Sequence, residues 1–114
     1  MVVLNEKTRE RVAARFRALG EPMRLKILER LFRGEASVNE ILEDVGGTQA
    51  NVSKHLSVLF AERLLERRKE GTRTLYAIAD PMLEKICAIV CGGVQQDARR
   101  EARELVPRGR PGRA

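Results

Sequence analysis

Residues 37–65 read SVNEILEDVGGTQANVSKHLSVLFAERLL and contain the most informative structural pattern in the chain. It begins with the pattern of a capping box, in which the Ser37 hydroxyl and the Glu40 carboxylate each accept a hydrogen bond from the other residue's backbone N–H. Apolar residues then recur at helical spacing as far as Gly46 and Gly47, which can adopt the left-handed conformation that ends a helix. The pattern predicts a short helix between Ser37 and the glycine pair.

A second helix is predicted to follow at once. Thr48 is a typical N-cap residue, and the helical spacing continues to about Ala61. The side predicted to be buried holds Val52, Leu56 and Leu59. The other side is short, polar and free of carboxylates until Glu62, and it consists of Ala50, Ser53, Lys54 and Ser57, with Gln49 at its border. Two short helices around a tight glycine turn indicate a helix-turn-helix.

The outer face of this second helix has the properties of a DNA-reading surface. A helix that is slim and lacks anions can enter the major groove and offer hydrogen bonds to base edges. We therefore expect it to contact double-stranded DNA. The same face would also suit the solvated side of a helical bundle, because helix-turn-helix geometry occurs without nucleic acid.

Residues 64–78 favour a β-hairpin with its turn at Glu70-Gly71. Cations gather near this turn, opposed only by Glu66 and Glu70; they are Arg67, Arg68, Lys69 and Arg73. In many proteins such a cluster serves only solubility. Directly after a helix-turn-helix, it favours a wing that lies against DNA phosphates.

The composition limits the class of protein. The chain has 114 residues, the size of one small domain, and its 22 Lys and Arg against 16 Asp and Glu favour a polyanionic partner. Apolar runs stay well short of 18 residues and no secretory segment follows Met1, so we expect a cytoplasmic protein that does not enter a membrane. With one histidine and neither a phosphate-binding glycine loop nor a nucleophile elbow, it is not expected to be an enzyme.

Further helices are predicted on either side of this region. Residues 5–19 form a basic amphipathic helix, and a core helix starting near Pro22 carries Leu25, Ile27, Leu28, Leu31 and Phe32. A last helix runs from Met82 to at least Val90. It is apolar nearly all round, so we expect it to pack against its own subunit and a two-fold mate. The pair Gly92-Gly93 either ends this helix or lets two backbones approach closely.

The predicted organisation has two parts. Residues 1–94 form a winged helix-turn-helix domain for DNA binding and dimerisation. Residues 95–114 form a charged C-terminal extension, and within it residues 107–113 have the composition of a disordered basic tail.

Three stretches together resemble the ArsR/SmtB family of dimeric winged-helix repressors: FRALGEPMRLKIL at 16–28, VSKHL at 52–56 and RKEG at 68–71. The resemblance covers roughly residues 16–91. It implies a mainly α fold with a β-hairpin wing, in the order α-α-α-α-β-β-α. It also implies a homodimer that represses transcription from an inverted-repeat DNA operator.

Repressors of the resembling family sense metals, metalloids or sulfur and redox species at a few recurrent sites. The arsenic-type Cys-x-Cys is absent, because positions 37–39 are Ser-Val-Asn. The zinc-type Asp-x-His is also not matched, because Asp80 is followed by Met82 at the position of the histidine. The remaining candidates are Cys87 and Cys91, which share one face of the last helix at spacing i, i+4.

Three interpretations of Cys87 and Cys91 remain open. They are buried apolar filler, a thiol or persulfide switch, or ligands for a soft metal ion, Cu(I), Cd(II), Hg(II) or As(III), shared between two copies. A disulfide within the intact helix is disfavoured. Residues at i, i+4 keep their Cβ atoms about 5–6 Å apart, whereas a disulfide needs about 3.5–4.5 Å.

Two further side chains have expected roles. Arg24 is expected to pair with a carboxylate or a helix end, with phosphate contact as the alternative. His55 flanks the apolar stripe, so a half-buried hydrogen bond or a phosphate contact is favoured over metal binding. Rival functions are a winged helix that docks an acidic protein and a DNA-binding regulator without a ligand.

Overall fold

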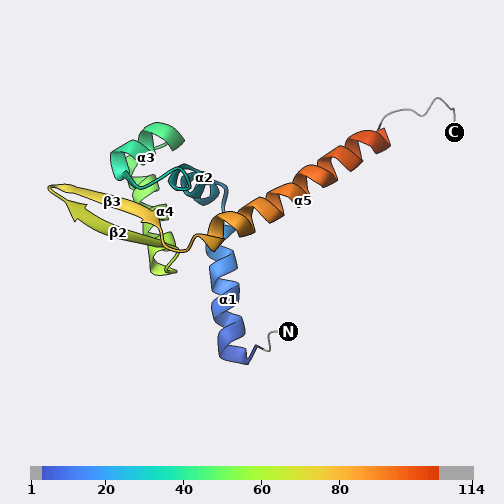
Figure 1. Cartoon of the computed structure of the whole chain (residues 1–114), viewed down its shortest axis with the longest axis horizontal. Coiled ribbons are helices and arrows are strands. Elements are labelled where there is room, and N and C mark those ends of the chain that lie inside the picture. The colour runs from blue at the N-terminus through green and yellow to red at the C-terminus, as the bar shows by residue number, and fades with distance from the viewer. Residues whose placement is uncertain (1–3, 106–114) are drawn as a thin grey trace. The chain divides into compact units, whose positions relative to one another are not determined.

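The structure is a computed structural model that describes residues 4–105. The elements, shown in Figure 1, follow in the order α1 (Glu6–Leu19), α2 (Pro22–Leu31), β1 (Ala36–Ser37), α3 (Val38–Val45), α4 (Gln49–Ala61), β2 (Leu65–Glu70), β3 (Arg73–Ile78) and α5 (Met82–Leu105). The chain divides into two compact units between Pro81 and Met82. The winged unit holds α1 to β3, and α5 forms the other unit.

The helix-turn-helix forms as the local chemistry predicts. At the start of α3, the backbone N–H of Glu40 donates to Ser37 Oγ at 3.2 Å and that of Ser37 donates to Glu40 Oε1 at 2.8 Å. Gly46 and Gly47, with φ of 80° and 88°, make the turn. Thr48 then caps α4 by accepting from the backbone N–H of Asn51 at 3.1 Å. The predicted capping box and N-cap are therefore confirmed.

The core of the winged unit lies between α2, α3 and α4. Its largest fully buried side chains are Ile27, Leu28, Ile41, Val52, Leu56 and Leu59. The inner face predicted for α4 is thus confirmed. The prediction that Leu25 joins the core is wrong, because that side chain is 43% exposed. At 100° per residue, Leu25 lies well away from the direction shared by Ile27 and Leu28.

A three-stranded antiparallel sheet closes the winged unit, in the order β1-β3-β2. The predicted hairpin of β2 and β3 is confirmed, and Gly71 in its turn has φ of 62°. In Figure 1 the two strands extend side by side beyond the helices. The short strand β1 was not predicted, because two residues carry no recognisable pattern; Ala36 pairs with Tyr76 and Ser37 with Leu75.

The last helix is unbroken from Met82 to Leu105 and therefore passes through Gly92 and Gly93. The glycine pair therefore does not end the helix, and the close approach of two backbones at this pair stays a prediction. The predicted boundary between residues 94 and 95 stays a prediction, and the tail at 107–113 lies outside the described residues. In the described part of the chain, no helix is long and apolar enough to span a bilayer.

Candidate nucleic-acid interface

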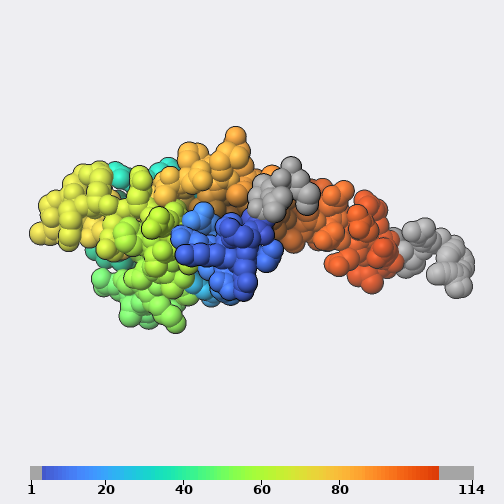
Figure 2. All heavy atoms as spheres, turned by 90° about the horizontal axis from the view of Figure 1, so that it is seen from below, coloured from blue at the N-terminus to red at the C-terminus, as the bar shows by residue number. Residues whose placement is uncertain are grey.

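The outer face of α4 is at the surface of the winged unit. Gln49, Ala50, Lys54 and Ser57 are exposed, and Ser53 is half-buried. The opposite side of α4 is packed against α1, α2, α3 and β2. Figure 2 shows the surface of α4, in green, beside that of the hairpin, in yellow, with α1 in blue on its other side. The helix is therefore held on its apolar side and offers its polar, carboxylate-free side to a partner.

The register of the hairpin separates its cations onto two faces. Arg67 lies opposite Tyr76 and Lys69 opposite Thr74, while Arg68 lies opposite Leu75. Successive side chains of a strand point to opposite faces, and paired residues share a face. Arg67 and Lys69 therefore share one face, and the other carries Arg68, Glu70 and Arg73.

Carboxylates hold both arginines of this second face. The Arg68 guanidinium donates to both oxygens of Glu35, at 3.1 Å through Nε and 2.6 Å through Nη2, and Arg73 donates to Glu70 at 2.9 Å. The Arg68 guanidinium lowers the pKa of Glu35, and Arg73 lowers that of Glu70. Sequence analysis missed Glu35 because it lies 33 residues before Arg68. The cluster is thus less positive than the sequence indicated.

The positive charges of the first face, which carries Arg67 and Lys69, are less neutralised by carboxylates than those of the second face. The Arg67 guanidinium stacks over the ring of Phe60, 4.0 Å from its centroid, and this contact joins the hairpin to the end of α4. Lys69 forms no salt bridge within residues 4–105. Stacking leaves the charge of Arg67 in place, so this face presents two positive charges next to α4.

A polar contact lies under α4, where it crosses the start of α2. Glu21 is the N-cap of α2 and accepts from the backbone N–H of Arg24 at 3.0 Å, which lowers the pKa of the Glu21 carboxyl. His55 Nδ1 is 4.0 Å from Glu21 Oε1, and its side chain is only 10% exposed. His55 is more buried than predicted, which favours the hydrogen-bonding role over the phosphate contact considered for it.

Arg24 also differs from expectation. Its Nε is buried and has no hydrogen-bond partner in the described part of the chain. The expected pairing of this side chain with a carboxylate is therefore not made at Nε. Among residues 4–105, His55 Nδ1 is the other buried side-chain nitrogen or oxygen that makes no hydrogen bond.

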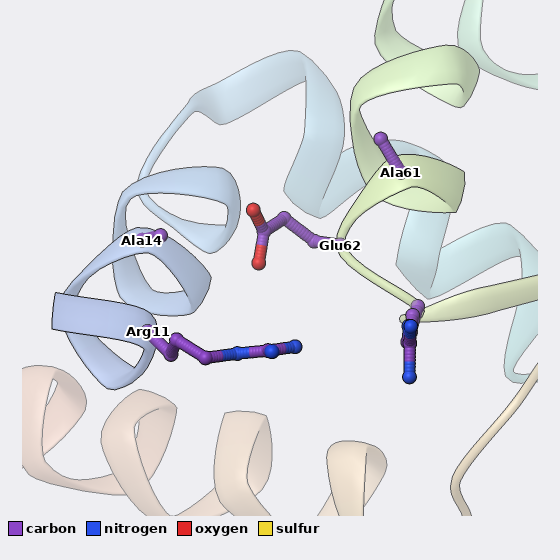
Figure 3. A pocket seen from close by; sticks show the side chains of 5 residues that line it. Arg11, Ala14, Ala61 and Glu62 are labelled. Atoms are coloured by element: carbon purple, nitrogen blue, oxygen red, sulfur yellow. The ribbon is translucent and has the colours of Figure 1, made fainter. Parts of the chain in front are cut away.

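A pocket of about 240 Å³ lies between α1 and the end of α4. It is lined by Arg11, Ala14, Ala61, Glu62 and Arg63. In Figure 3 the Arg11 side chain reaches from α1 towards the turn after α4, and the Glu62 carboxylate points back towards α1. Arg15 strengthens this junction by donating to the backbone oxygen of Glu62 at 3.3 Å. These contacts tie α1 to the end of α4.

The cysteines lie on α5, one turn apart. Cys87 is half-buried and Cys91 is exposed, and both are free thiols. Burial raises the pKa of the Cys87 thiol, which makes its thiolate less available at neutral pH. Residues 4–105 contain no cluster of three or more His, Cys, Asp or Glu side chains that could hold a metal ion. A site with three or more protein ligands at these cysteines would need residues from a second copy.

Comparison with known proteins agrees with this architecture. Residues 21–67 match the family described as bacterial regulatory protein, arsR family. A helix-turn-helix transcriptional regulator of Methanocaldococcus jannaschii is 35% identical over 82 residues, which cover 71% of this chain and 92% of that protein. A probable mercury resistance operon repressor of Streptomyces lividans is 41% identical over 66 residues, 58% of this chain and 53% of that protein. The match thus spans about half of the latter's length.

The fold is shared with a solved structure. The homodimeric winged helix-turn-helix DNA-binding domain of a possible ArsR-family regulator from Mycobacterium bovis, determined by NMR, superposes with a TM-score of 0.75 at 29% identity. The superposition covers 88% of this chain and 95% of that chain. The likeness therefore includes the hairpin as well as the helix-turn-helix.

Proposed function

The chain belongs to the arsR family of bacterial DNA-binding transcriptional regulators, which are not enzymes, and from this premise we propose that it is a homodimeric repressor of an inverted-repeat operator. The observation that carries the proposal is the outer face of α4. It is polar, exposed and free of carboxylates, while Val52, Leu56 and Leu59 fix the helix from behind. Such a helix suits the major groove.

The side chains divide into reading and positioning roles. Gln49, Ser53 and Lys54 are proposed to reach base edges or the phosphates beside them, with Ala50 and Ser57 in close contact with the groove. On the hairpin, Lys69 and Arg67 are proposed to contact phosphates. Arg68 and Arg73 are proposed to add positive charge near the DNA phosphates mainly through their exposed edges, because Glu35 and Glu70 already hold their guanidinium groups.

A second copy is proposed to cover the apolar side chains of α5 and α1. On α5, Ile89 is 74% exposed and Val90 60%; on α1, Phe16 is 60% exposed. Large apolar groups exposed on one helix face mark an interaction surface. The homodimeric M. bovis neighbour supports this arrangement. Two copies of α4 would then dock in successive major grooves about 34–36 Å apart.

The signal is proposed to enter at Cys87 and Cys91. The exposure of Cys91 does not fit the role of buried filler in the single chain, whereas the shared helix face would bring four thiols together across a two-fold axis. Four thiolates suit Hg(II) or another soft ion, and the resemblance to a mercury resistance repressor supports this choice. A sulfur or redox species acting on the same thiols is the alternative.

DNA binding tests the proposal. A duplex selected by the protein from a random-sequence library is compared with a random duplex by fluorescence anisotropy, across a salt series. We expect preference for a two-fold symmetric site, with affinity that falls steeply as salt rises. Preference for an acidic protein over every duplex would instead establish the rival function of a protein-docking winged helix.

The sensor is tested with the same duplex. Hg(II), Cd(II) and inorganic polysulfide are each added to the wild type and to the Cys87→Ser/Cys91→Ser variant. We expect at least one of them to release the wild type from DNA and to leave the variant bound. Equal responses of both proteins would remove the cysteines as the sensor, and no response at all would indicate a regulator without a ligand.

A further inference from the structure

The His55 imidazole on α4, whose Nδ1 makes no hydrogen bond within residues 4–105, is the feature that the proposed function leaves unexplained. His55 Nδ1 is buried, has no hydrogen-bond partner within residues 4–105 and lies 4.0 Å from Glu21 Oε1. Buried polar atoms in proteins nearly always have a partner. A gap of 4.0 Å is too long for a hydrogen bond, yet a shift of about 1 Å would close it.

Glu21 is suited to receive this hydrogen bond. As the N-cap of α2, it is held by the backbone N–H of Arg24, so its carboxylate has a defined place. The Arg24 N–H lowers the pKa of Glu21 most strongly, and His55 adds a smaller effect in the same direction. A carboxylate has further lone pairs after one backbone bond, so it can also accept from Nδ1.

The location gives the contact a consequence for DNA. His55 follows Lys54 directly and precedes Leu56, so it lies between a residue of the outer face and a residue of the core. A hydrogen bond to Glu21 would restrain rotation of α4 about its axis, because it acts beside the apolar stripe rather than on it. Rotation of α4 changes where Gln49, Ser53 and Lys54 point.

We propose that Nδ1–H of His55 donates to the Glu21 carboxylate and that this pair is a positioning contact, which sets the rotation of α4 for reading the operator. The proposal rests on the proposed DNA-binding function. The pair touches neither base nor phosphate and acts through the helix. Its loss should therefore affect selected DNA more than random DNA, since phosphate contacts tolerate a small rotation better than base contacts do.

Nuclear magnetic resonance of the imidazole tests the pair without DNA. The chain contains one histidine, so every imidazole nitrogen signal belongs to His55. We expect a proton on Nδ1 at neutral pH and a marked shift of both ring nitrogens in Glu21→Gln. Glutamine keeps an oxygen for the Arg24 N–H but lacks the negative charge, so the helix cap is retained. Unchanged ring signals in Glu21→Gln would overturn the pair.

DNA binding then tests its positioning role. Glu21→Gln should weaken binding to the selected duplex about tenfold, the size of one hydrogen bond to a charged group, and should weaken binding to a random duplex much less. His55→Gln should do the same, and the double variant should lose no more than either alone. Glu21→Asp keeps the negative charge that Glu21→Gln removes, so it should retain part of the preference for the selected duplex that Glu21→Gln loses. Additive losses, or equal losses on both duplexes, would overturn the positioning role.

A matched control separates this pair from helix capping in general. Glu40→Gln makes the same chemical change at the start of α3, where the carboxylate accepts from Ser37. It should leave the His55 ring signals and the ratio of selected to random affinity unchanged, and a shift of either would count against the proposal. If the wild type bound no duplex, the proposed function would fail, while the imidazole signals would still decide whether the pair exists.

Discussion

The winged unit buries its large apolar side chains, whereas α5 exposes several of its own. In the winged unit, Ile27, Leu28 and Leu56 are fully buried between helices. On α5, Ile89 and Val94 are more than half exposed. The winged unit therefore carries a core of its own, whereas these apolar side chains of α5 are exposed in the single chain, where the proposed second copy would cover them. Stability and dimerisation should respond to substitutions in different units.

The largest effect is expected inside the core of the winged unit. Leu56→Ala removes a fully buried side chain and should lower the free energy of unfolding by about 2–5 kcal/mol. Urea unfolding followed by circular dichroism measures it. The neighbouring Ser57→Ala, on the exposed side of α4, should change the free energy by less than about 0.5 kcal/mol. Equal losses would contradict the assignment of inner and outer faces.

The next effect is expected on α5 and concerns assembly. Ile89→Glu places a charge in the exposed apolar face, so it should prevent pairing and weaken operator binding about a hundredfold, because one copy then binds alone. Light scattering after gel filtration measures the mass. Arg99→Glu places a carboxylate in the charged part of α5, two turns beyond Cys91, and should leave the dimer intact. A dimeric Ile89→Glu would assign dimerisation to another surface.

A smaller effect separates two regions within the winged unit. Lys69→Ala, on the open face of the hairpin, should weaken binding to selected and random duplexes alike, by about tenfold, and lower the salt slope by about one. Gln49→Ala should mainly reduce the preference for the selected duplex. Affinity titrations on both duplexes at several salt concentrations measure the difference. Equal losses on both duplexes for Gln49→Ala would contradict its reading role.

The smallest effect is expected on the melting temperature at acidic pH. The Ser37 backbone N–H and hydroxyl lower the pKa of Glu40 from its ordinary value of 4.5, so the folded state favours the ionised carboxylate. This stabilisation is present above that ordinary value and is lost as the pH falls through the lowered one. Glu40→Gln should therefore flatten the decline of melting temperature between about pH 5 and pH 3. Glu43→Gln, on the same helix but outside the capping box, should leave the wild-type slope.

Local patterns predicted most of the helix-turn-helix. Ser37, Glu40 and Thr48 act within three residues of themselves, so the capping bonds follow from the order of residues alone. The inner face of α4 followed from helical spacing in the same way. Leu25 shows the limit of this reasoning. It is apolar and belongs to a core helix, yet only the direction in which α2 packs decides that it faces outwards.

The electrostatics of the hairpin could not be predicted, because its partners are remote in sequence. Arg68 is bound by Glu35 and Arg67 stacks on Phe60, and neither contact follows a period of helix or strand. The His55 imidazole likewise comes close to the Glu21 carboxylate only because α2 and α4 cross. Sequence alone located the helix-turn-helix and the hairpin, since hydrogen bonds and apolar periodicity act over a few residues, but it left the end of α5 open. Tertiary structure alone decided which charges remain open to DNA, since distant residues are neutralised only when packing brings them together.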